Sequence, residues 1–295
     1  MESLVLLALL AVAGFLAQLV DGSLGMGYGI TSSTVLIFIG LSPAAASASV
    51  HIAKIGTGAS SGFAHHRFGN VDWQVARRIA LPGAIGAFVG AILLSGLSTA
   101  SSRPISSSLL FLLGIYVLIR FLKGGLRPLR KGVPRLRFLI PVGLVGGFVD
   151  ATGGGGWGPV ATPALLADGR LAPNRVVGTV SASEFIVAIA ASLGFFFGIG
   201  VAGVRFDYVV ALLVGGFIAA PIAAYVVRRL QPRLLGVIVG GFICFTNARV
   251  LLGAAGVDGE AFLVVYAAIV MIWVTAIVRV LSLIRRESRG APSPR

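Results

Sequence analysis

The sequence predicts an all-α membrane protein that crosses the bilayer several times, because its composition is too apolar for a soluble domain. Hydrophobic residues make up 57% of the 295 residues and charged residues only 12%. Several apolar runs reach the roughly 20 residues that a helix needs to cross a bilayer. The net charge of +14 comes from Arg and Lys residues that lie mostly in short loops between these runs. Such loops set membrane topology, so we expect membrane lipid around this protein and no nucleic-acid partner.

The first half of the chain opens with an apolar segment that is interrupted by glycines. Leu4–Val20 has no basic stretch before its apolar core and follows Glu2, so we expect a membrane helix and not a cleaved signal peptide. The motif DGSLGMGYG at Asp21–Gly29 breaks this helix, because glycine is costly to hold in helical conformation. A turn is expected at Ser101–Pro104. The other helices of this half are expected at Ile30–Leu41, Ala44–Ala64, Ile79–Leu97 and Ile105–Leu122.

The second half follows a connector, Lys123–Arg137, that is rich in Lys and Arg and contains no acid. An apolar run from Phe138 to Ala167 is broken by DATGGGGWGP at Asp150–Pro159, where four consecutive glycines and a proline oppose a helix. The tail after Arg285 is expected to be disordered. The helices are expected at Phe138–Val149, Val160–Ala167, Arg175–Ile199, Tyr208–Val227, Leu234–Leu252 and Ala261–Leu283.

The two halves form an internal repeat. LVDGSLGMGYG matches FVDATGGGGWG at an offset of 129, which pairs Asp21 with Asp150. With one residue inserted, SPAAASASVHIAK matches APNRVVGTVSASE, which pairs Lys54 with Glu184. Duplicated halves are a common plan of secondary transporters. We therefore divide the chain into a first transmembrane repeat (1–122), a basic cytoplasmic connector (123–137), a second repeat (138–252), an extra transmembrane helix (253–284) and a basic tail (285–295).

The distribution of positive charge predicts how the halves are oriented. The connector, the 65–78 loop, the Arg228–Arg233 turn and the C-terminus can all lie in the cytoplasm only if each glycine-broken segment is a re-entrant hairpin. The two repeats are then inverted relative to each other. We expect a multi-pass protein of the cytoplasmic membrane with a cytoplasmic C-terminus.

Each break predicts an anion site inside the membrane. The half-helix after it begins with N–H groups that lack intrahelical partners and carry partial positive charge. Glycines let an anion approach such a backbone without a Cβ in the way. Irregular backbone at this depth persists only when it is buried in protein or lines a cavity. Ser and Thr nearby either contact the anion or only cap the broken helices. The substrate-binding candidates are Gly25, Gly27, Thr31, Ser32, His51, Lys54, Gly153, Gly154, Gly155, Gly156, Trp157 and Ser183.

Ionisable residues within the apolar segments are the second indication of function, because they are costly in a membrane and usually face a partner or a pathway. Lys54 and Glu184 occupy equivalent repeat positions, either as an anion-attracting lysine with a titrating partner or as a structural ion pair. His51 shares a helix face with Lys54. Asp21 and Asp150 either cap the half-helices or carry a coupling proton. Weaker candidates are Asn247 and Arg249 in the penultimate segment.

The two breaks, the SPAAASASVHIAK helix and the APNRVVGTVSASE helix resemble the sulfite exporter TauE/SafE family of membrane transporters, from about Leu4 to about Leu283. The first break is less glycine-rich than the second, because Leu24, Met26 and Tyr28 interrupt it. The resemblance implies a secondary transporter that exports sulfite or organosulfonates such as sulfoacetate, with alternating access and a proton as a possible coupling ion.

Two other functions are open at this point. The chain is either an anion channel or a passive membrane subunit of a larger complex if its flux neither saturates nor couples to protons. An enzyme is disfavoured, because His, Asp and Glu within the apolar segments are too few for a metal site or a paired acid and base. We expect no cofactor and no metal, and a small anion as ligand. The small-residue face Gly83–Gly90 serves either a homodimer or internal packing.

Overall fold

The computed structural model describes residues 2–123, 132–226 and 232–290. Within these residues the regular structure is helical, and seven helices are long and apolar enough to cross a membrane. The elements are α1 (Glu2–Leu24), α2 (Tyr28–Phe38), α3 (Pro43–Arg67), α4 (Trp73–Ser95), α5 (Thr99–Lys123), α6 (Leu136–Gly153), α7 (Trp157–Asp168), α8 (Pro173–Ile199), the 3-10 turn η1 (Val201–Gly203), α9 (Phe206–Val226), α10 (Pro232–Ala254) and α11 (Gly259–Gly290).

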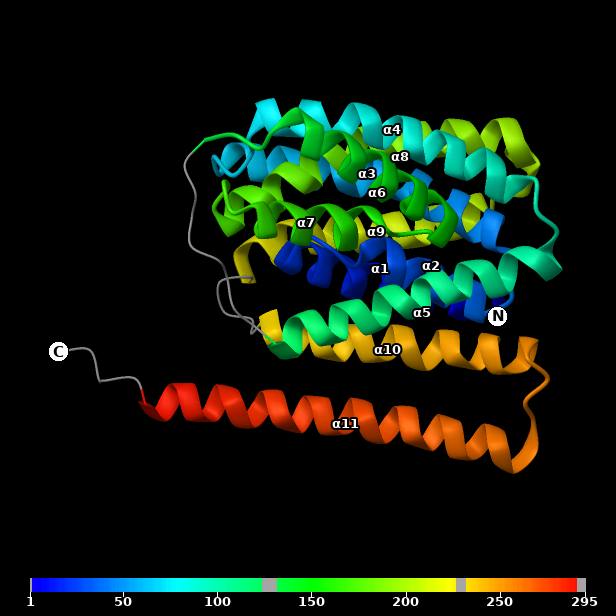
Figure 1. The fold of residues 1–295 in the computed structure, drawn as a ribbon. Coiled ribbons are helices and arrows are strands. Elements are labelled where there is room, and N and C mark those ends of the chain that lie inside the picture. The colour runs from blue at the N-terminus through cyan, green and yellow to red at the C-terminus, as the bar shows by residue number, and fades with distance from the viewer. Residues whose placement is uncertain (1, 124–131, 227–231, 291–295) are drawn as a thin grey trace.

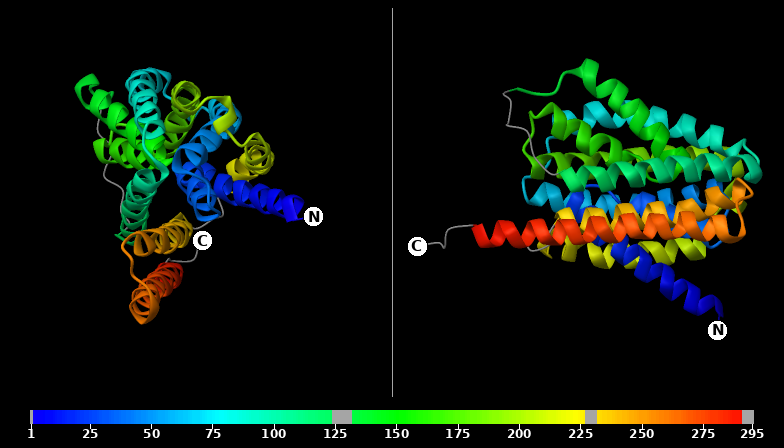
Figure 2. Two further views of the ribbon diagram at one scale, coloured as in Figure 1. Left: turned by 90° about the vertical axis from the view of Figure 1, so that its right-hand side faces the viewer. Right: turned by 60° about the horizontal axis from the view of Figure 1, so that its bottom comes forward.

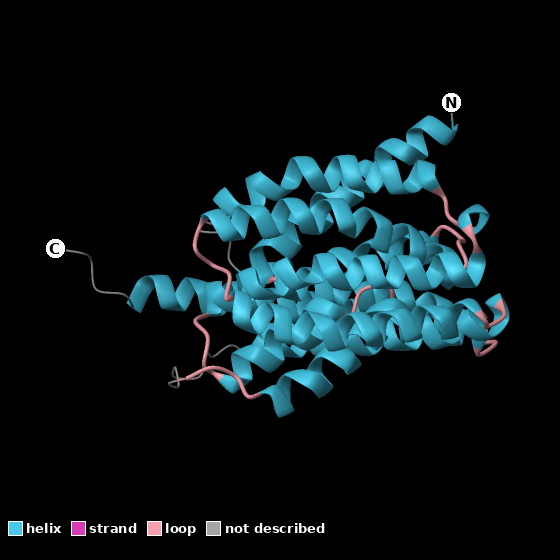
Figure 3. Ribbon diagram, turned by 90° about the horizontal axis from the view of Figure 1, so that it is seen from above, coloured by secondary structure: helices cyan, strands magenta, loops and turns pink. Residues whose placement is uncertain are grey.

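The order of long and short helices is the same in both halves, with α1–α5 corresponding to α6–α10. The long helices lie side by side along one axis, and the turns gather at two ends of the bundle (Figure 1). α11 follows as an additional helix at the edge of the bundle, where it packs on α10 (Figure 2). Its Trp273 indole donates to the carbonyl of Val237. Within the described residues the fold therefore consists of two five-helix halves and one peripheral helix. Figure 3 shows the helices of the bundle from above.

Two polar contacts identify the ends at which the short helices finish. Arg175 at the start of α8 lies 3.5 Å from Asp72, so α7 finishes at the end where α3 turns into α4. We call this the basic end, because α5 finishes there with Arg120 and Lys123. Arg103 at the start of α5 donates to the carbonyl of Gly40, so α2 finishes at the opposite end. The two short helices therefore leave the centre of the protein in opposite directions.

Glycines bring the helices of the two halves into close contact. α4 packs on α6, and a Cβ placed on Gly86 or Gly147 would overlap the backbone of the facing helix. α1 packs on α9 in the same way, through Gly14 and Gly215. The first helix of each half thus packs on the fourth helix of the other. The face Gly83–Gly90 is used for this internal packing, since Gly83 faces Trp157 and Gly90 faces Phe148.

Several predicted boundaries were wrong. α1 continues to Leu24 and α6 to Gly153, so the breaks are only residues 25–27 and 154–156. Residues Ser101–Pro104 lie within α5 and do not form the predicted turn, because Pro104 does not end the helix. α11 runs to Gly290, so the first part of the expected disordered tail is helical. Most of the predicted connector and the positions 228 and 229 lie outside the described residues.

Candidate functional site

The two breaks have the same local construction. Glycine is required in each, because Gly25, Gly27 and Gly154 have φ values of 66°, 136° and 77°. An aspartate one turn before each break reaches across it to the next helix. Asp21 Oδ1 accepts from the amide of Tyr28 at 3.3 Å, and Asp150 Oδ1 accepts from the amide of Trp157 at 3.0 Å. Both aspartates are therefore caps of the half-helices, one of the two predicted roles.

These caps change the predicted anion site. The first N–H group of each half-helix already binds a carboxylate, so it is not open to an external anion in this structure. The negative charge that the helix dipole favours is supplied by the chain itself. The predicted anion site therefore cannot use the first N–H group of either half-helix while its aspartate cap is in place.

The breaks cross in direct contact, and the contacts obey the repeat offset. Ser33 Oγ donates to the carbonyl of Gly154 at 2.7 Å, and Thr162 Oγ1 donates to the carbonyl of Gly25 at 2.7 Å. Adding 129 to Ser33 and Gly25 gives Thr162 and Gly154, so these two hydrogen bonds are reciprocal. The same holds for two close backbone approaches. A Cβ on Gly29 would lie 2.6 Å from Gly155 Cα, and one on Gly158 would lie 2.7 Å from Met26 Cα.

The carbonyl groups left free at the end of α6 are satisfied by hydroxyl groups from other helices. Ser47 of α3 donates to the carbonyl of Ala151, and Ser106 of α5 donates to the carbonyl of Thr152. Unpaired backbone groups are costly in a membrane, so these serines make the interruption tolerable. Sequence reasoning missed both. Ser47 had a usable signal, because it lies one turn before His51 on α3.

A buried charge cluster adjoins the crossing. Lys54 Nζ lies 2.9 Å and 3.0 Å from the two carboxylate oxygens of Asp150 and 2.8 Å from Glu184 Oε1. His51 Nε2 lies 3.0 Å from Asp150 Oδ2. Lys54 is 1% exposed, His51 and Asp150 are 0% exposed, and Glu184 is 8% exposed. Lys54 and Glu184 thus meet as their repeat positions predicted, and Asp150 joins them.

The hydrogen bonds of His51 indicate that this cluster holds a proton. The Nδ1 atom lies 2.8 Å from the carbonyl of Ser47, which only accepts, so Nδ1 carries hydrogen. The Ser47 hydroxyl donates to Ala151 and so cannot donate to Nδ1. The Nε2 atom faces an oxygen of Asp150, and a bond there needs a second hydrogen on either His51 or Asp150. With this proton, the formal charges of Lys54, His51, Asp150 and Glu184 sum to zero. Asp21 is a further buried carboxyl that interacts electrostatically with Glu184, Lys54 and Asp150.

The other candidates lie around the cluster with simpler roles. Trp157 is fully buried, and both its indole nitrogen and the Ser183 hydroxyl donate to the carbonyl of Val180. Asn247 donates to Thr34 Oγ1 at 3.0 Å and so joins α10 to α2. Two further predictions concern the hydroxyls of Thr31 and Ser32, the fourth and fifth residues of α2. Both are buried and have no hydrogen-bond partner among the described residues.

The remaining predicted residues lie at helix ends or on other helices and are not part of the charge cluster. Gly153 is the last residue of α6, and Gly156 precedes the first residue of α7. Arg249 lies over the Phe38 ring at 5.2 Å. In the part of the chain that the structure describes, no three His, Cys, Asp or Glu side chains are placed to hold a metal ion.

Comparison with known proteins agrees with this architecture. The model of the family "Sulfite exporter TauE/SafE" matches residues 10–250. The chain is also 49% identical over 280 residues to the "Probable membrane transporter protein YtnM" of Bacillus subtilis (strain 168), covering 94% of this chain and 93% of that protein. No solved structure matches. The matched family segment contains both breaks, the buried charge cluster and the helices that enclose them.

Proposed function

Because the chain belongs to the sulfite exporter TauE/SafE family of membrane transporters, we propose that it is a secondary transporter that exports small sulfur-containing anions. Sulfite or an organosulfonate such as sulfoacetate is the proposed cargo, and the cytoplasmic membrane is the proposed location. The single observation that carries the mechanism is the charge cluster of Lys54, His51, Asp150 and Glu184, buried where the two breaks cross.

We further propose that the two halves are inverted repeats and that each broken segment is a re-entrant hairpin. The reciprocal hydrogen bonds of Ser33 and Thr162 support a two-fold relation between the halves. The opposite directions of α2 and α7 support the inversion. The basic end is then cytoplasmic by the positive-inside rule, and the C-terminus of α11 lies at that same end (Figure 1).

The anion site is proposed at Lys54, the cation of the cluster. Lys54 has two carboxylate partners, and Glu184 is the more exposed of them. An anion that replaces Glu184 beside Lys54 leaves the charge of the site unchanged only if Glu184 takes up a proton or swings toward water. The proton held between His51 and Asp150 is close enough to move when the anion replaces Glu184. Loss of that proton would make the cluster net negative and would disfavour anion binding.

Alternating access then follows from the two-fold arrangement. The cluster stays near the crossing, and the halves rearrange so that either end of the bundle reaches it. The anion and the proton are carried together, because the site stays electrically balanced only when both are bound. Coupling of this kind predicts saturable flux that responds to a pH gradient, unlike the flux through a channel.

The test is flux into proteoliposomes that contain this chain alone, with radiolabelled sulfite and sulfoacetate as probes. We expect saturable uptake that an imposed pH gradient accelerates. His51→Gln should abolish the response to the gradient, because glutamine holds no transferable proton. His66→Gln is the matched control, since His66 lies exposed at the end of α3. Non-saturable flux would indicate a channel, and an unchanged gradient response in His51→Gln would exclude His51 as the coupling group.

A further inference from the structure

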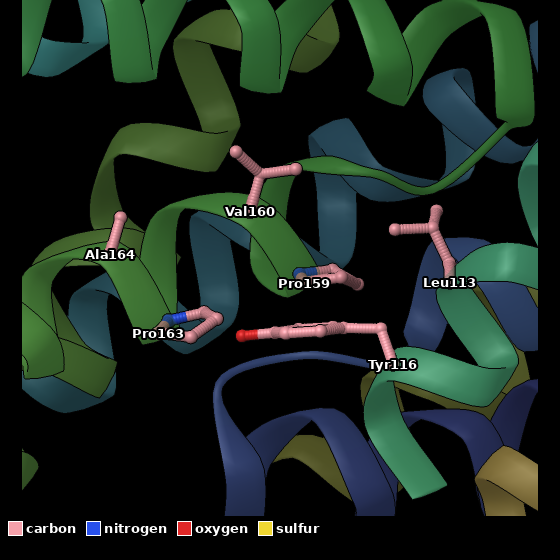
Figure 4. A pocket seen from close by; sticks show the side chains of 6 residues that line it. All are labelled: Leu113, Tyr116, Pro159, Val160, Pro163 and Ala164. Carbon is pink, nitrogen blue, oxygen red and sulfur yellow. The ribbon is translucent and has the colours of Figure 1, made fainter. Parts of the chain in front are cut away.

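A cleft of about 400 Å³ lies between α5 and α7, beside the second break (Figure 4). Tyr116 reaches from α5 toward α7, and its hydroxyl points toward Pro163 (Figure 4). The cleft is open along one side, and its lining is largely apolar apart from the Tyr116 hydroxyl. The residues that line the cleft are Leu113, Tyr116, Pro159, Val160, Pro163 and Ala164.

The cleft lies along the first two turns of α7, the helix that begins at the second break. Pro159 is the third residue of α7, and the first residue, Trp157, is held by Asp150 of the cluster. From there α7 runs to the basic end, where the start of α8 meets the α3–α4 turn. The cleft therefore borders the half of α7 that is nearer to the crossing, and the rest of α7 leads to the basic end.

The corresponding place in the other half is closed. In the repeat, α10 corresponds to α5 and α2 corresponds to α7. α10 and α2 pack directly on each other. Asn247 of α10 donates to Thr34 of α2 at 3.0 Å, and these residues are 1% and 2% exposed. α2 finishes at the end opposite to the basic end, so the closed contact lies on that side of the crossing. The two halves thus differ: one short helix borders a cleft and the other is covered.

We propose that the α5–α7 cleft is the route by which the transported anion reaches Lys54 from the basic end, and that the Asn247–Thr34 hydrogen bond holds the opposite route shut. This inference rests on the proposed transport function and adds the route and its latch. The conformation described is then the one open at the basic end. In the opposite conformation α5 closes on α7 and α10 separates from α2, which breaks the Asn247–Thr34 bond.

A filling substitution tests the route. Leu113→Trp places bulk in the cleft, and Leu112→Trp makes the same change on the neighbouring residue, which is 61% exposed and does not line the cleft. Uptake of radiolabelled sulfite and sulfoacetate should fall about tenfold or more in Leu113→Trp, since a filled space excludes a solute, and stay near wild type in Leu112→Trp. Equal, near-normal uptake in both variants would overturn the route and leave a lipid chain as the occupant of the cleft. Absence of uptake by the wild-type protein would instead refute the transport function.

Thiol labelling tests the latch without relying on flux. Cys244 is the single cysteine of the chain, so Ala164→Cys is introduced together with Cys244→Ser. A membrane-impermeant maleimide should label this variant from the basic end in inverted vesicles. Adding Asn247→Ala should lower the labelling, because loss of the latch favours the opposite conformation. Labelling from the opposite face only, or labelling unchanged by Asn247→Ala, would overturn the proposal.

Discussion

Replacing Lys54 with methionine removes the cation from the buried cluster and keeps most of the side-chain volume. Glu184 then loses its described ion-pair partner, whereas Asp150 keeps the bonds from His51 and from the amide of Trp157. Breaking a buried ion pair by removing one partner costs roughly 3–5 kcal/mol, because the remaining charge is stranded. For a protein of this size such a loss lowers the melting temperature by roughly 6–20 °C. We therefore expect Lys54→Met to be strongly destabilised.

Thermal unfolding in detergent at pH 7 and at pH 5 measures this effect. The deficit should be smaller at pH 5, because protons neutralise the stranded carboxylates. Lys54→Met combined with Glu184→Gln should recover more than half of the loss, since the double change leaves no stranded glutamate. Lys123→Met at the exposed end of α5 is the control for loss of a positive charge. A melting temperature of Lys54→Met equal to that of the wild type, or no recovery in the double variant, would refute the reasoning.

Two further predictions concern the crossing itself. Gly155→Ala should fail to fold or unfold at a much lower temperature than the wild type, because a Cβ there overlaps the backbone of Gly29 and Ile30. Gly253→Ala is the control: its Cβ meets open space, so this change should be neutral or slightly stabilising. Equal melting temperatures of the two variants would contradict the close contact at Gly155. Ser33→Ala and Thr162→Val should each cost about 1–3 kcal/mol in thermal unfolding, since each leaves one buried carbonyl unsatisfied; a loss in only one of them would contradict the reciprocity of the two hydrogen bonds.

Sequence patterns predicted the helices and one long-range contact well. The repeat offset identified Lys54 and Glu184 as equivalent positions, and the structure shows an ion pair between them, which was one of the two predicted alternatives. The ends of the breaks were less predictable. Glycine and proline were taken as helix breakers, but α6 carries Pro141 within it and extends into the glycine run. Tight packing against neighbouring helices overrides the weak intrinsic preference of these residues.

The position of Asp150 in the cluster could not be predicted, because Asp21 and Asp150 are equivalent in the repeat. Both have the same capping role, and nothing in the motifs says which of them receives Lys54. The difference arises one helix later, where the pair of residues facing the cap has diverged between the halves. His51 and Lys54 stand in α3 where Ser181 and Glu184 stand in α8.

If the proposed proton coupling holds, this divergence restricts which residues can carry it. The halves share the aspartate caps and the reciprocal hydrogen bonds of Ser33 and Thr162, so the crossing itself is nearly symmetric. The charges are not symmetric: Asp150 contacts Lys54 and His51, whereas the repeat equivalents of these two residues are Glu184 and Ser181. A rearrangement that exchanges the two halves therefore cannot return the same charge pattern. In the alternating-access mechanism proposed above, the proton between His51 and Asp150 would therefore have different surroundings in the two conformations, as coupling to an anion requires.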